Sequence, residues 1–328
     1  MALLKMNKIG LLTSGGDAPG MNAAIRAIVR TGLYNNMEVV GIYNGYEGLI
    51  KKQFKLMERN SVSNIIQRGG TILKTARSEQ FKTEEGMELA YTHLQEEQID
   101  ALIVIGGDGT FTGAHIFGHK FDYPIVGLPG TIDNDLYGTD LTIGYDTAVN
   151  TVVEAVDKIR DTAQSHDRLF FVEVMGRDAG FIALRSGLAS GADNILVPET
   201  KTNIDNLIRM LKYDWKRNKT SGIIIVAEGD DQGGAYEIAR KVEEKFNEFE
   251  TRVTILGHIQ RGGSPTAMDR VLASQLGYES VNALLNGERD IMIGMSNNQV
   301  SYTPFEKAIK SQKSIKHTYL EIARILSL

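Results

Sequence analysis

Short apolar runs alternate with amphipathic stretches along most of this chain. Ile9–Leu12 and Ala101–Ile105 are continuously apolar, and Leu169–Val174 is apolar except for Glu173, which is typical of strands buried on both faces. Between such runs, apolar residues recur at three- and four-residue spacing, as they do from Val149 to Ile159. Strands that alternate with helices predict a doubly wound α/β architecture, in which mostly parallel sheets are flanked by helices.

The expected elements follow from this pattern. Strands are expected at 9–12, 38–43, 101–105, 125–128, 169–174, 195–198, 223–227 and 252–256. Helices are expected at 21–35, 83–97, a short segment after Thr110, 147–162, 179–189, 204–217, 235–246, 268–286 and near 318–325. The C-terminal forty residues otherwise look polar. No linker rich in Pro, Gly or Ser divides the chain, so we expect two intimately packed lobes rather than separate domains joined by a flexible linker.

Composition narrows the class of protein. The 328 residues include 42% hydrophobic and 23% charged residues, and no apolar stretch approaches the ~20 residues of a membrane span. The start is too short for a signal peptide, and the absence of cysteine fits a reducing cytosol, so a cytoplasmic location is expected. The net charge of −5 supplies no basic field to attract nucleic acid.

Glycines and acids gather where strands are expected to end. Thr13 to Asn22 forms a glycine-rich turn into a helix, but it lacks the Lys-Ser/Thr ending of a P-loop. Gly106-Gly107-Asp108-Gly109-Thr110 is more specific, because such glycines let backbone amides approach phosphate while the acid holds Mg²⁺. In the purely structural alternative, Asp108 only caps the following helix.

Asp133 and Asp135 follow the strand at 125–128 and form the strongest local pair. Two carboxylates at the end of a buried strand are costly unless they meet a metal, a proton or a cation. Asp133 is therefore a candidate base for a substrate hydroxyl, with Asp135 nearer a metal or orienting its neighbours. Two solvent-facing turn formers are the alternative.

Later strand ends add a second group of polar side chains. Met175-Gly176-Arg177 and His258 to Gly263 follow two expected strands, and Glu228 follows a third. Arg261, flanked closely by glycines, is suited to paired hydrogen bonds with a phosphate. Glu228 is suited to accept from a sugar hydroxyl, or alternatively to cap a turn. His258 alone would be an ordinary structural histidine, and its place beside Arg261 makes a ligand role the alternative.

These segments occur in the order found in phosphofructokinases. The motifs are Gly15-Gly16-Asp17, Gly106 to Thr110, Pro129 to Asp135, Met175 to Arg177, Ala227-Glu228-Gly229 and His258 to Ser264. The chain resembles the short bacterial ATP-dependent 6-phosphofructokinases from about Lys8 to Asn286. The resemblance implies a transferase of glycolysis that phosphorylates fructose 6-phosphate with Mg-ATP. It also implies an ATP-binding lobe at 1–145 plus 259–305 and a sugar-phosphate lobe at 146–258 plus 306–328.

Individual roles come with the resemblance. Asp133 corresponds to the catalytic base, with Thr131, Arg177 and Asp135 as the other catalytic candidates. The ATP-binding candidates are Gly16, Arg77, Ser78, Gly107, Asp108, Gly109 and Thr110, with Asp108 as the Mg²⁺ ligand. The sugar-phosphate candidates are Thr131, Asp133, Arg168, Met175, Gly176, Arg177, Glu228, Arg252, His258 and Arg261. The family takes the ligands matching Arg168 and Arg252 from a neighbouring subunit, which implies a homotetramer with shared sites.

An allosteric site for ADP or phosphoenolpyruvate is also implied. Its candidate residues are Arg26, Arg30, Arg59, Arg160, Gly191, Asp193, Arg217 and Lys219. The chain departs from the family at Asp193, which replaces a Glu, and at Asn60, where relatives often have an aromatic residue. Ser78 replaces a larger residue, and Asp178 stands where His or Asn is common. The effector's identity therefore stays open.

Glycines at two positions bear on the phosphoryl donor. Pyrophosphate-using relatives have Asp where Gly109 stands and Lys where Gly130 stands, so this chain favours ATP. A pyrophosphate-dependent enzyme remains the main alternative. A non-catalytic nucleotide-sensing subunit would be expected to have lost Asp133, and NAD or lipid kinases should lack Thr-Ile-Asp-Asn-Asp.

Overall fold

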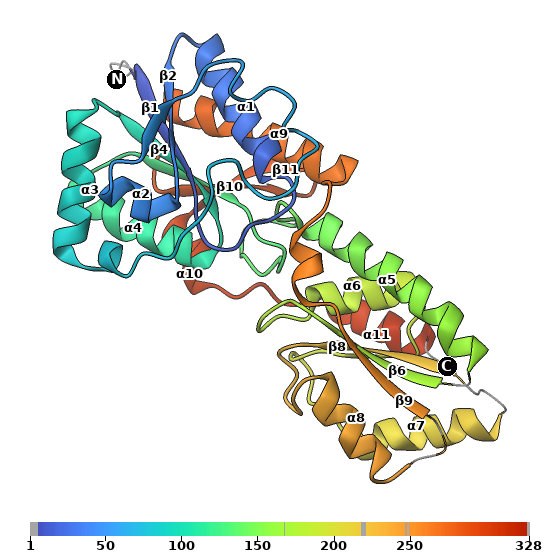
Figure 1. Cartoon of the computed structure of the whole chain (residues 1–328). Coiled ribbons are helices and arrows are strands. Elements are labelled where there is room, and N and C mark those ends of the chain that lie inside the picture. The colour runs from blue at the N-terminus through green and yellow to red at the C-terminus, as the bar shows by residue number, and fades with distance from the viewer. Residues whose placement is uncertain (1–5, 167, 218–220, 247, 249, 327–328) are drawn as a thin grey trace. The chain divides into compact units, whose positions relative to one another are not determined.

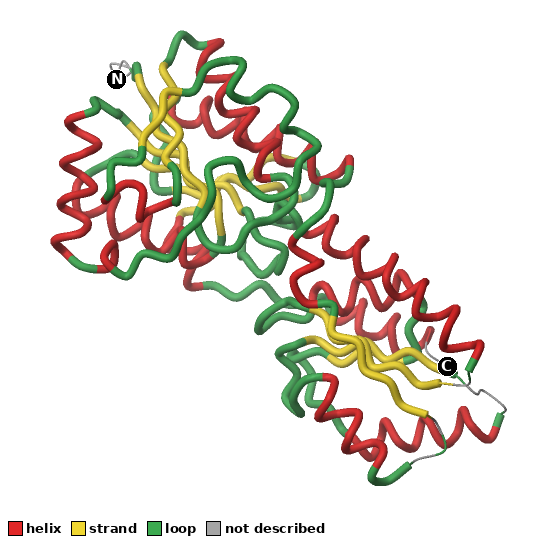
Figure 2. Tube along the Cα trace, in the orientation of Figure 1, coloured by secondary structure: helices red, strands yellow, loops and turns green. Residues whose placement is uncertain are grey.

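The computed structural model describes residues 6–166, 168–217, 221–246, 248 and 250–326. The chain divides into two compact units, which are described separately. The first comprises Met1–Ile132, Leu136–Thr147 and Arg261–Lys313. The second comprises Asp133–Asp135, Ala148–Gln260 and Ser314–Leu328. Figure 2 shows strands flanked by helices in each unit, which confirms the α/β prediction.

A seven-stranded mixed sheet forms the centre of the first unit. Its strand order is β11-β10-β5-β4-β1-β2-β3, and only β3 and β11 run antiparallel to their neighbours. The strands are β1 (Lys8–Thr13), β2 (Glu38–Ile42), β3 (Phe54–Leu56), β4 (Ala101–Gly106), β5 (Ile125–Pro129), β10 (Ile291–Ser296) and β11 (Gln299–Pro304). The parallel strands β1, β4 and β5 lie next to one another, so their carboxyl ends share one edge.

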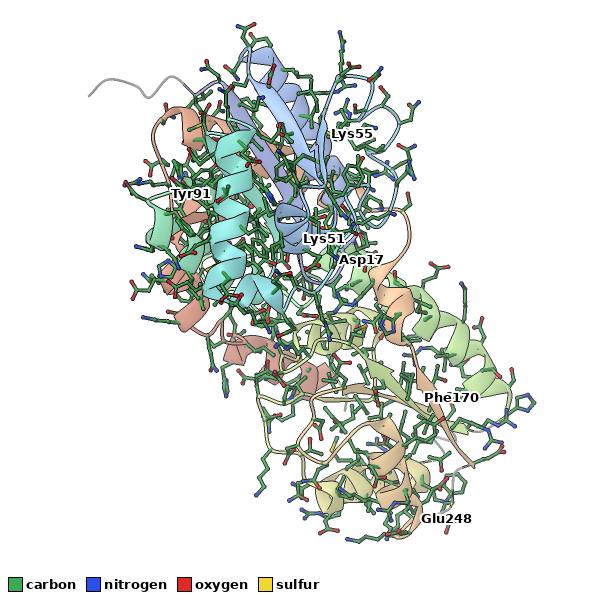
Figure 3. All side chains as sticks on the ribbon, turned by 60° about the vertical axis from the view of Figure 1, so that its left-hand side comes forward. Asp17, Lys51, Lys55, Tyr91, Phe170 and Glu248 are labelled. Atoms are coloured by element: carbon green, nitrogen blue, oxygen red, sulfur yellow. The ribbon has the colours of Figure 1, made fainter. Side chains whose placement is uncertain are left out.

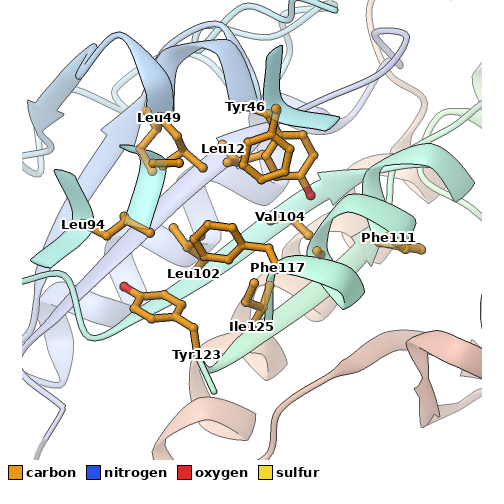
Figure 4. Packing of buried hydrophobic residues seen from close by; sticks show 14 of the residues in the cluster. Leu12, Tyr46, Leu49, Leu94, Leu102, Val104, Phe111, Phe117, Tyr123 and Ile125 are labelled. Atoms are coloured by element: carbon orange, nitrogen blue, oxygen red, sulfur yellow. The ribbon is translucent and has the colours of Figure 1, made fainter. Parts of the chain in front are cut away.

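Helices cover both faces of this sheet (Figure 1). On one face α1 (Met21–Tyr34) packs beside α9 (Ala267–Leu285). The other face carries α2 (Gly45–Ile50), α3 (Glu84–Glu96), α4 (Asp108–Phe121) and α10 (Phe305–Lys310). A buried cluster that includes Leu102, Phe111 and Phe117 fills the space between that face and its helices (Figure 4). Burial of such apolar surface is the main force that holds the layers together.

The second unit contains a four-stranded parallel sheet in the order β7-β8-β6-β9. Its strands are β6 (Arg168–Val174), β7 (Asn194–Leu196), β8 (Gly222–Ala227) and β9 (Glu250–Ile255). Helices cover both sides of this sheet (Figure 1). One side carries α5 (Tyr145–Ser165), α6 (Phe181–Ser190) and α11 (His317–Leu326), and the other carries α7 (Ile204–Lys216) and α8 (Ala235–Glu243). Phe170, labelled in Figure 3, belongs to β6, one of the two inner strands.

Two sequence predictions were wrong in detail, and two short elements were missed. The region after residue 290 contains β10, β11 and α10, and residues 291–294 of β10 are buried, although we expected a polar tail there. The short α2 and β3 were not predicted. The segment expected to be short after Thr110 is the 14-residue helix α4, which begins at Asp108. Within the described residues, no helix has the length and apolar character needed to cross a membrane.

Candidate active site

The loops after β1, β4 and β5 meet at one edge of the first unit's sheet. The backbone N–H of Ser14, just after β1, donates to the carbonyl oxygen of Ile105 at 2.9 Å. The N–H of Gly130, just after β5, donates to the carbonyl of Gly106 at 2.9 Å. The strand order reverses between β1 and β4, because β1 is followed by β2 on one side and β4 by β5 on the other. Open α/β sheets bind ligands at such a point.

Glycines at this edge have two different surroundings: Gly109 has empty space beside it, whereas Gly16 and Gly130 are closely packed by neighbouring atoms. A Cβ atom at Gly16 would lie 2.4 Å from Nη1 of Arg261, so this arginine lies against the loop that contains Asp17. Figure 3 labels Asp17 in this loop. A Cβ at Gly130 would lie 2.8 Å from Cγ2 of Ile105. By contrast, a Cβ at Gly109 would meet no atom within 4 Å. Gly109 therefore faces open space, whereas Gly130 is required by its neighbours.

The amino end of α4 presents an acidic group at this edge. Asp108 is exposed in the first turn, where the helix dipole favours negative charge, and it does not occupy the N-cap position, which is Gly107. Next to it, Oγ1 of Thr110 is buried and has no hydrogen-bond partner among the described residues. Burial raises the pKa of the Tyr46 phenol far above its usual value, so this neutral hydroxyl donates to the Thr110 carbonyl oxygen at 2.5 Å.

Arg77 and Ser78 lie in the loop that precedes a 3-10 turn at Gln80–Lys82. Arg77 is exposed, and Ser78 is half-buried and donates from its hydroxyl to Oε2 of Glu47 at 2.6 Å. Hydrogen bonds from Lys51 and Ser78 hold the pKa of Glu47 below its usual value. The Ser78 hydroxyl is thus already engaged by a neighbouring carboxylate.

Thr131 and Asp133 follow β5 but group with different units. Thr131 lies in the first unit, where a Cβ on Gly107 would be 3.8 Å from its own Cβ and where its carbonyl accepts from the Thr142 hydroxyl at 2.6 Å. Asp133 and Asp135 group with the second unit. Asp133 is buried, Asp135 is half-buried, and Asn134 between them has a left-handed backbone with φ of 54°. Burial of Asp133 disagrees with the solvent-facing alternative.

Hydrogen bonds join three loops at the carboxyl edge of the second unit's sheet. Oε1 of Glu228, after β8, accepts from the backbone N–H groups of Gly176 and Arg177 at 3.1 and 2.6 Å. Arg177 needs this support because its φ of 55° is unusual for a residue with a side chain. The Met175 N–H donates to Oε1 of Gln260 at 2.9 Å. Glu228 therefore fixes the shape of the turn that carries Arg177.

Gln260 is a residue that sequence reasoning missed. It is fully buried, and its Nε2 has no hydrogen-bond partner among the described residues. An unsatisfied buried donor is uncommon and often marks a functional position. Its position in the sequence could have identified it, because it lies between His258, which is exposed, and Arg261 in a loop expected at a strand end.

Arg168 and Arg252 lie at the opposite edge of the same sheet. Arg168 begins β6, and Arg252 is the third residue of β9, opposite Phe170. Both form ion pairs with Glu250, and the distance from Arg168 Nε to Glu250 Oε2 is 2.6 Å. Val174 lies six positions after Arg168 along β6, which corresponds to about 20 Å. These two arginines therefore do not join Arg177 and Glu228 in one cluster of this unit.

The effector candidates also divide between the units. Arg26 and Arg30 lie one turn apart on α1, and burial together with the charge of Arg30 lowers the pKa of Arg26. Nε of Arg30 is buried without a hydrogen-bond partner among the described residues, and Arg59 is exposed.

In the second unit, Arg160 donates to the carbonyls of Ser190 and Gly191 at 2.6 and 3.0 Å. Oδ2 of Asp193 accepts from the Ile223 N–H at 2.6 Å. Arg217 donates to the Tyr213 hydroxyl at 2.8 Å. Lys219 lies outside the described residues.

The chain is similar to known proteins over nearly its whole length. The chain is 56% identical over 320 residues to "ATP-dependent 6-phosphofructokinase 2" of Bacteroides thetaiotaomicron, and the match covers 98% of each chain. It is 53% identical to "ATP-dependent 6-phosphofructokinase 1" of Thermus thermophilus, covering 98% of this chain and 100% of the relative.

Among solved structures, phosphofructokinase from Saccharomyces cerevisiae matches with a TM-score of 0.89 and 39% identity. That match covers 98% of this chain and 48% of the yeast chain, so this chain spans about half of the yeast chain's length. A pyrophosphate-dependent phosphofructokinase from Marinobacter aquaeolei matches with a TM-score of 0.84, and at 21% identity it shows the fold alone. The family model described as phosphofructokinase matches residues 8–284, and the chain belongs to the phosphofructokinase family.

Proposed function

We propose that this chain transfers the γ-phosphoryl group of Mg-ATP to the 1-hydroxyl of D-fructose 6-phosphate. The products are fructose 1,6-bisphosphate and ADP, and the reaction is the committed step of glycolysis. The observation that carries the proposal is the identity of 50% or more, over nearly the full length, to relatives named ATP-dependent 6-phosphofructokinase.

The first unit supplies the groups that would bind the nucleotide. The open space beside Gly109 leaves room for phosphates, and the amino end of α4 favours their negative charge. The exposed carboxylate of Asp108 is the hard oxygen ligand that Mg²⁺ prefers. When bound, Mg²⁺ neutralises charge on the phosphate oxygens. Gly16, Gly107 and Thr110 complete the proposed nucleotide site, with Arg77 and Ser78 at its margin.

The proposed acceptor groups follow β5 and the strands of the second unit. Asp133 takes the proton of the 1-hydroxyl as that oxygen attacks the γ-phosphorus in line with the departing ADP oxygen. Thr131 and Arg177 stabilise the charge on the transferring group, and Asp135 orients its neighbours. Met175, Gly176, Glu228, His258 and Arg261 are proposed to hold the sugar phosphate. Because one oxygen of Glu228 already supports the turn at Arg177, its other oxygen is the one we assign to a sugar hydroxyl.

Packing and charge both favour ATP over pyrophosphate as the phosphoryl donor. A lysine at position 130 would place its Cβ 2.8 Å from Ile105 and 3.0 Å from Cε of Met21, so the packing at this strand end would have to shift. An aspartate at position 109 would fit, but its charge would repel a nucleotide phosphate.

Sharing of sites between subunits is supported by where two arginines lie. Arg168 begins β6 at the amino edge of the second unit's sheet, about 20 Å along the strand from Val174, and Arg252 lies on β9 opposite Phe170. Cationic ligands so placed are better suited to the sugar phosphate of another copy. We therefore propose a homotetramer, the assembly that the family resemblance implies, working in the cytoplasm.

Regulation by ADP or phosphoenolpyruvate is a further part of the proposal. Two like-charged arginines one turn apart, Arg26 and Arg30, favour a bound anion, and Arg59, Arg160, Gly191, Arg217 and Lys219 are assigned with them. Oδ2 of Asp193 already accepts from the backbone N–H of Ile223. If Asp193 helps to hold an effector-bound metal ion, it would therefore do so through its other carboxylate oxygen or through a water molecule.

A coupled assay tests the proposal directly. It supplies fructose 6-phosphate and Mg²⁺ with either ATP or pyrophosphate, and measures fructose 1,6-bisphosphate. We expect turnover with ATP alone and stimulation or inhibition by ADP or phosphoenolpyruvate. Turnover with pyrophosphate alone would favour the pyrophosphate-dependent alternative, and no turnover with either donor would favour a non-catalytic subunit.

A further inference from the structure

The side chains of two histidines and one aspartate lie close together in the first unit, away from the glycine-lined edge. His115 and His119 lie one turn apart on α4, so their side chains share a face of the helix. Nδ1 of His115 is 2.9 Å from Oδ1 of Asp290, and Nε2 of His119 is 3.1 Å from Oδ2. The three ligand atoms lie within 4.8 Å of one another.

The backbone holds Asp290 firmly in this position. Its N–H donates to the carbonyl of Ile125 at 2.7 Å, and its carbonyl accepts from the N–H of Phe305 at 2.9 Å. Asp290 has a left-handed backbone, with φ of 57°, and directly precedes β10. The carboxylate is therefore presented by the sheet, while both imidazoles are presented by a helix. Ligands held on rigid elements need little reorganisation to bind an ion.

We propose that His115, His119 and Asp290 form a binding site for a divalent transition-metal ion such as Zn²⁺. Two histidines at i and i+4 on a helix, with a carboxylate from another element, form a donor set that suits Zn²⁺. Zn²⁺ coordinates nitrogen and oxygen at about 2.0–2.2 Å, so the ion would lie between the carboxylate and the two ring nitrogens that face it, with each neutral imidazole carrying its proton on the other ring nitrogen. The side chains are 26%, 65% and 32% exposed, which leaves a path for entry and room for a water ligand.

The chemistry of this site differs from that proposed for Mg²⁺ at Asp108. Imidazole nitrogen favours Zn²⁺, Cu²⁺ or Ni²⁺, whereas Mg²⁺ prefers oxygen ligands. His115 lies seven residues along α4 from Asp108, which corresponds to about 10 Å. Glu306, on α10, adds negative charge nearby: Lys310 chiefly, and the two imidazoles in smaller part, hold its pKa below the usual value.

The bound ion would join α4 to the residue that precedes β10. Since the ion binds the folded chain and the unfolded chain lacks the assembled site, it should raise the thermal stability of the protein. The consequence is structural, and it is independent of substrate and of phosphoryl transfer.

The test is metal titration of the full chain, free of any affinity tag and of substrates. Zn²⁺ binding is measured by calorimetry, and Co²⁺ is added to a second sample to detect the visible absorption of a site with nitrogen ligands. We expect one ion per chain at this site and a higher melting temperature with Zn²⁺. His119→Gln should bind at least about tenfold more weakly, because even outer-shell partners of metal ligands are worth ~10–100-fold.

Two further variants distinguish this site from binding elsewhere. Asp290→Asn keeps a residue that tolerates the left-handed backbone, and it should weaken binding as His119→Gln does. His166→Gln changes an exposed histidine on a turn elsewhere in the chain and should bind as the unchanged protein does. Equal affinity of all four proteins, or a loss of affinity in His166→Gln alone, would overturn the proposal.

Discussion

At the scale of single residues, polar side chains at strand ends hold unusual backbone in place. Arg177 combines a left-handed backbone with an exposed side chain, and the carboxylate of Glu228 holds it there through two backbone hydrogen bonds. The sequence located both residues at strand ends, but it carried no signal for the bond between them. Gln260 was missed because a single buried glutamine has no periodicity or motif to reveal it.

Replacing Glu228 tests this support. Glu228→Ala removes the acceptor of two N–H groups and should lower the free energy of unfolding by about 1–3 kcal/mol, with weaker binding of sugar phosphate. Glu228→Gln keeps an acceptor oxygen and should retain most of the stability. Chemical denaturation and substrate titration measure the two effects. Equal stability of all three proteins would show that the turn at Arg177 does not depend on this carboxylate.

Asp133 is the residue on which the proposed chemistry rests. Asp133→Ser should lower turnover by about 10²–10⁴-fold, the usual worth of general-base assistance, with sugar-phosphate affinity largely kept. A fall beyond that range would indicate lost positioning as well. Steady-state kinetics of Asp133→Ser are compared with those of Asp157→Ser, an exposed position on α5. Near-normal turnover of Asp133→Ser would contradict its assignment as the base.

At the scale of helices and strands, hydrophobic periodicity predicted the long elements well and the short ones poorly. The buried stripes of α1, α5 and the run of β4 are strong local signals. The start of α4 was placed too late because glycines at 109 and 113 lower helix propensity, which packing of Phe111 and Phe117 overcomes. The strands β10 and β11 were missed because they pair with each other, which a local pattern does not display.

Two glycines at the edge of the first unit's sheet should respond differently to the same change. Gly130→Ala places a methyl group 2.8 Å from Ile105 and should destabilise the protein by about 1–3 kcal/mol. Gly109→Ala meets no atom and lies in a helix, so stability should be kept or raised, while ATP affinity falls if phosphate occupies that space. Thermal melts and nucleotide titrations separate the two outcomes. A stable Gly130→Ala would show that this strand end accommodates a side chain.

At the scale of the whole molecule, strand direction decides which residues work together. Arg168 and Arg252 were predicted near strand starts. Parallel pairing of β6 with β9 brings Arg168 opposite Glu250, and Glu250 lies two residues before Arg252 on β9. Their distance from Arg177 could have been read from the predicted strand boundaries. What the sequence did not supply was the strand order, which depends on long-range pairing.

Shared sites predict that two defective variants complement each other. Asp133→Ser and Arg252→Ala should each be impaired, the latter through sugar-phosphate affinity. Mixed oligomers reassembled from equal amounts should regain activity, because roughly a quarter of the sites then pair an intact Asp133 with an intact Arg252 from another copy. Activity is measured before and after reassembly at low fructose 6-phosphate. If the reassembled mixture is no more active than the two variants assayed separately and added together, each chain uses its own Arg252.

The pairing of both arginines with Glu250 has a consequence for substrate affinity. An incoming phosphate would meet guanidinium groups that already hold an anion of the chain itself, so Glu250 acts as a built-in competitor. Hydrogen bonding from Arg168, helped by Arg252, keeps the pKa of Glu250 below its usual value, and the competitor therefore stays charged at neutral pH. Glu250→Gln should accordingly lower the KM for fructose 6-phosphate, and a raised KM would show instead that Glu250 orients the arginines for their ligand.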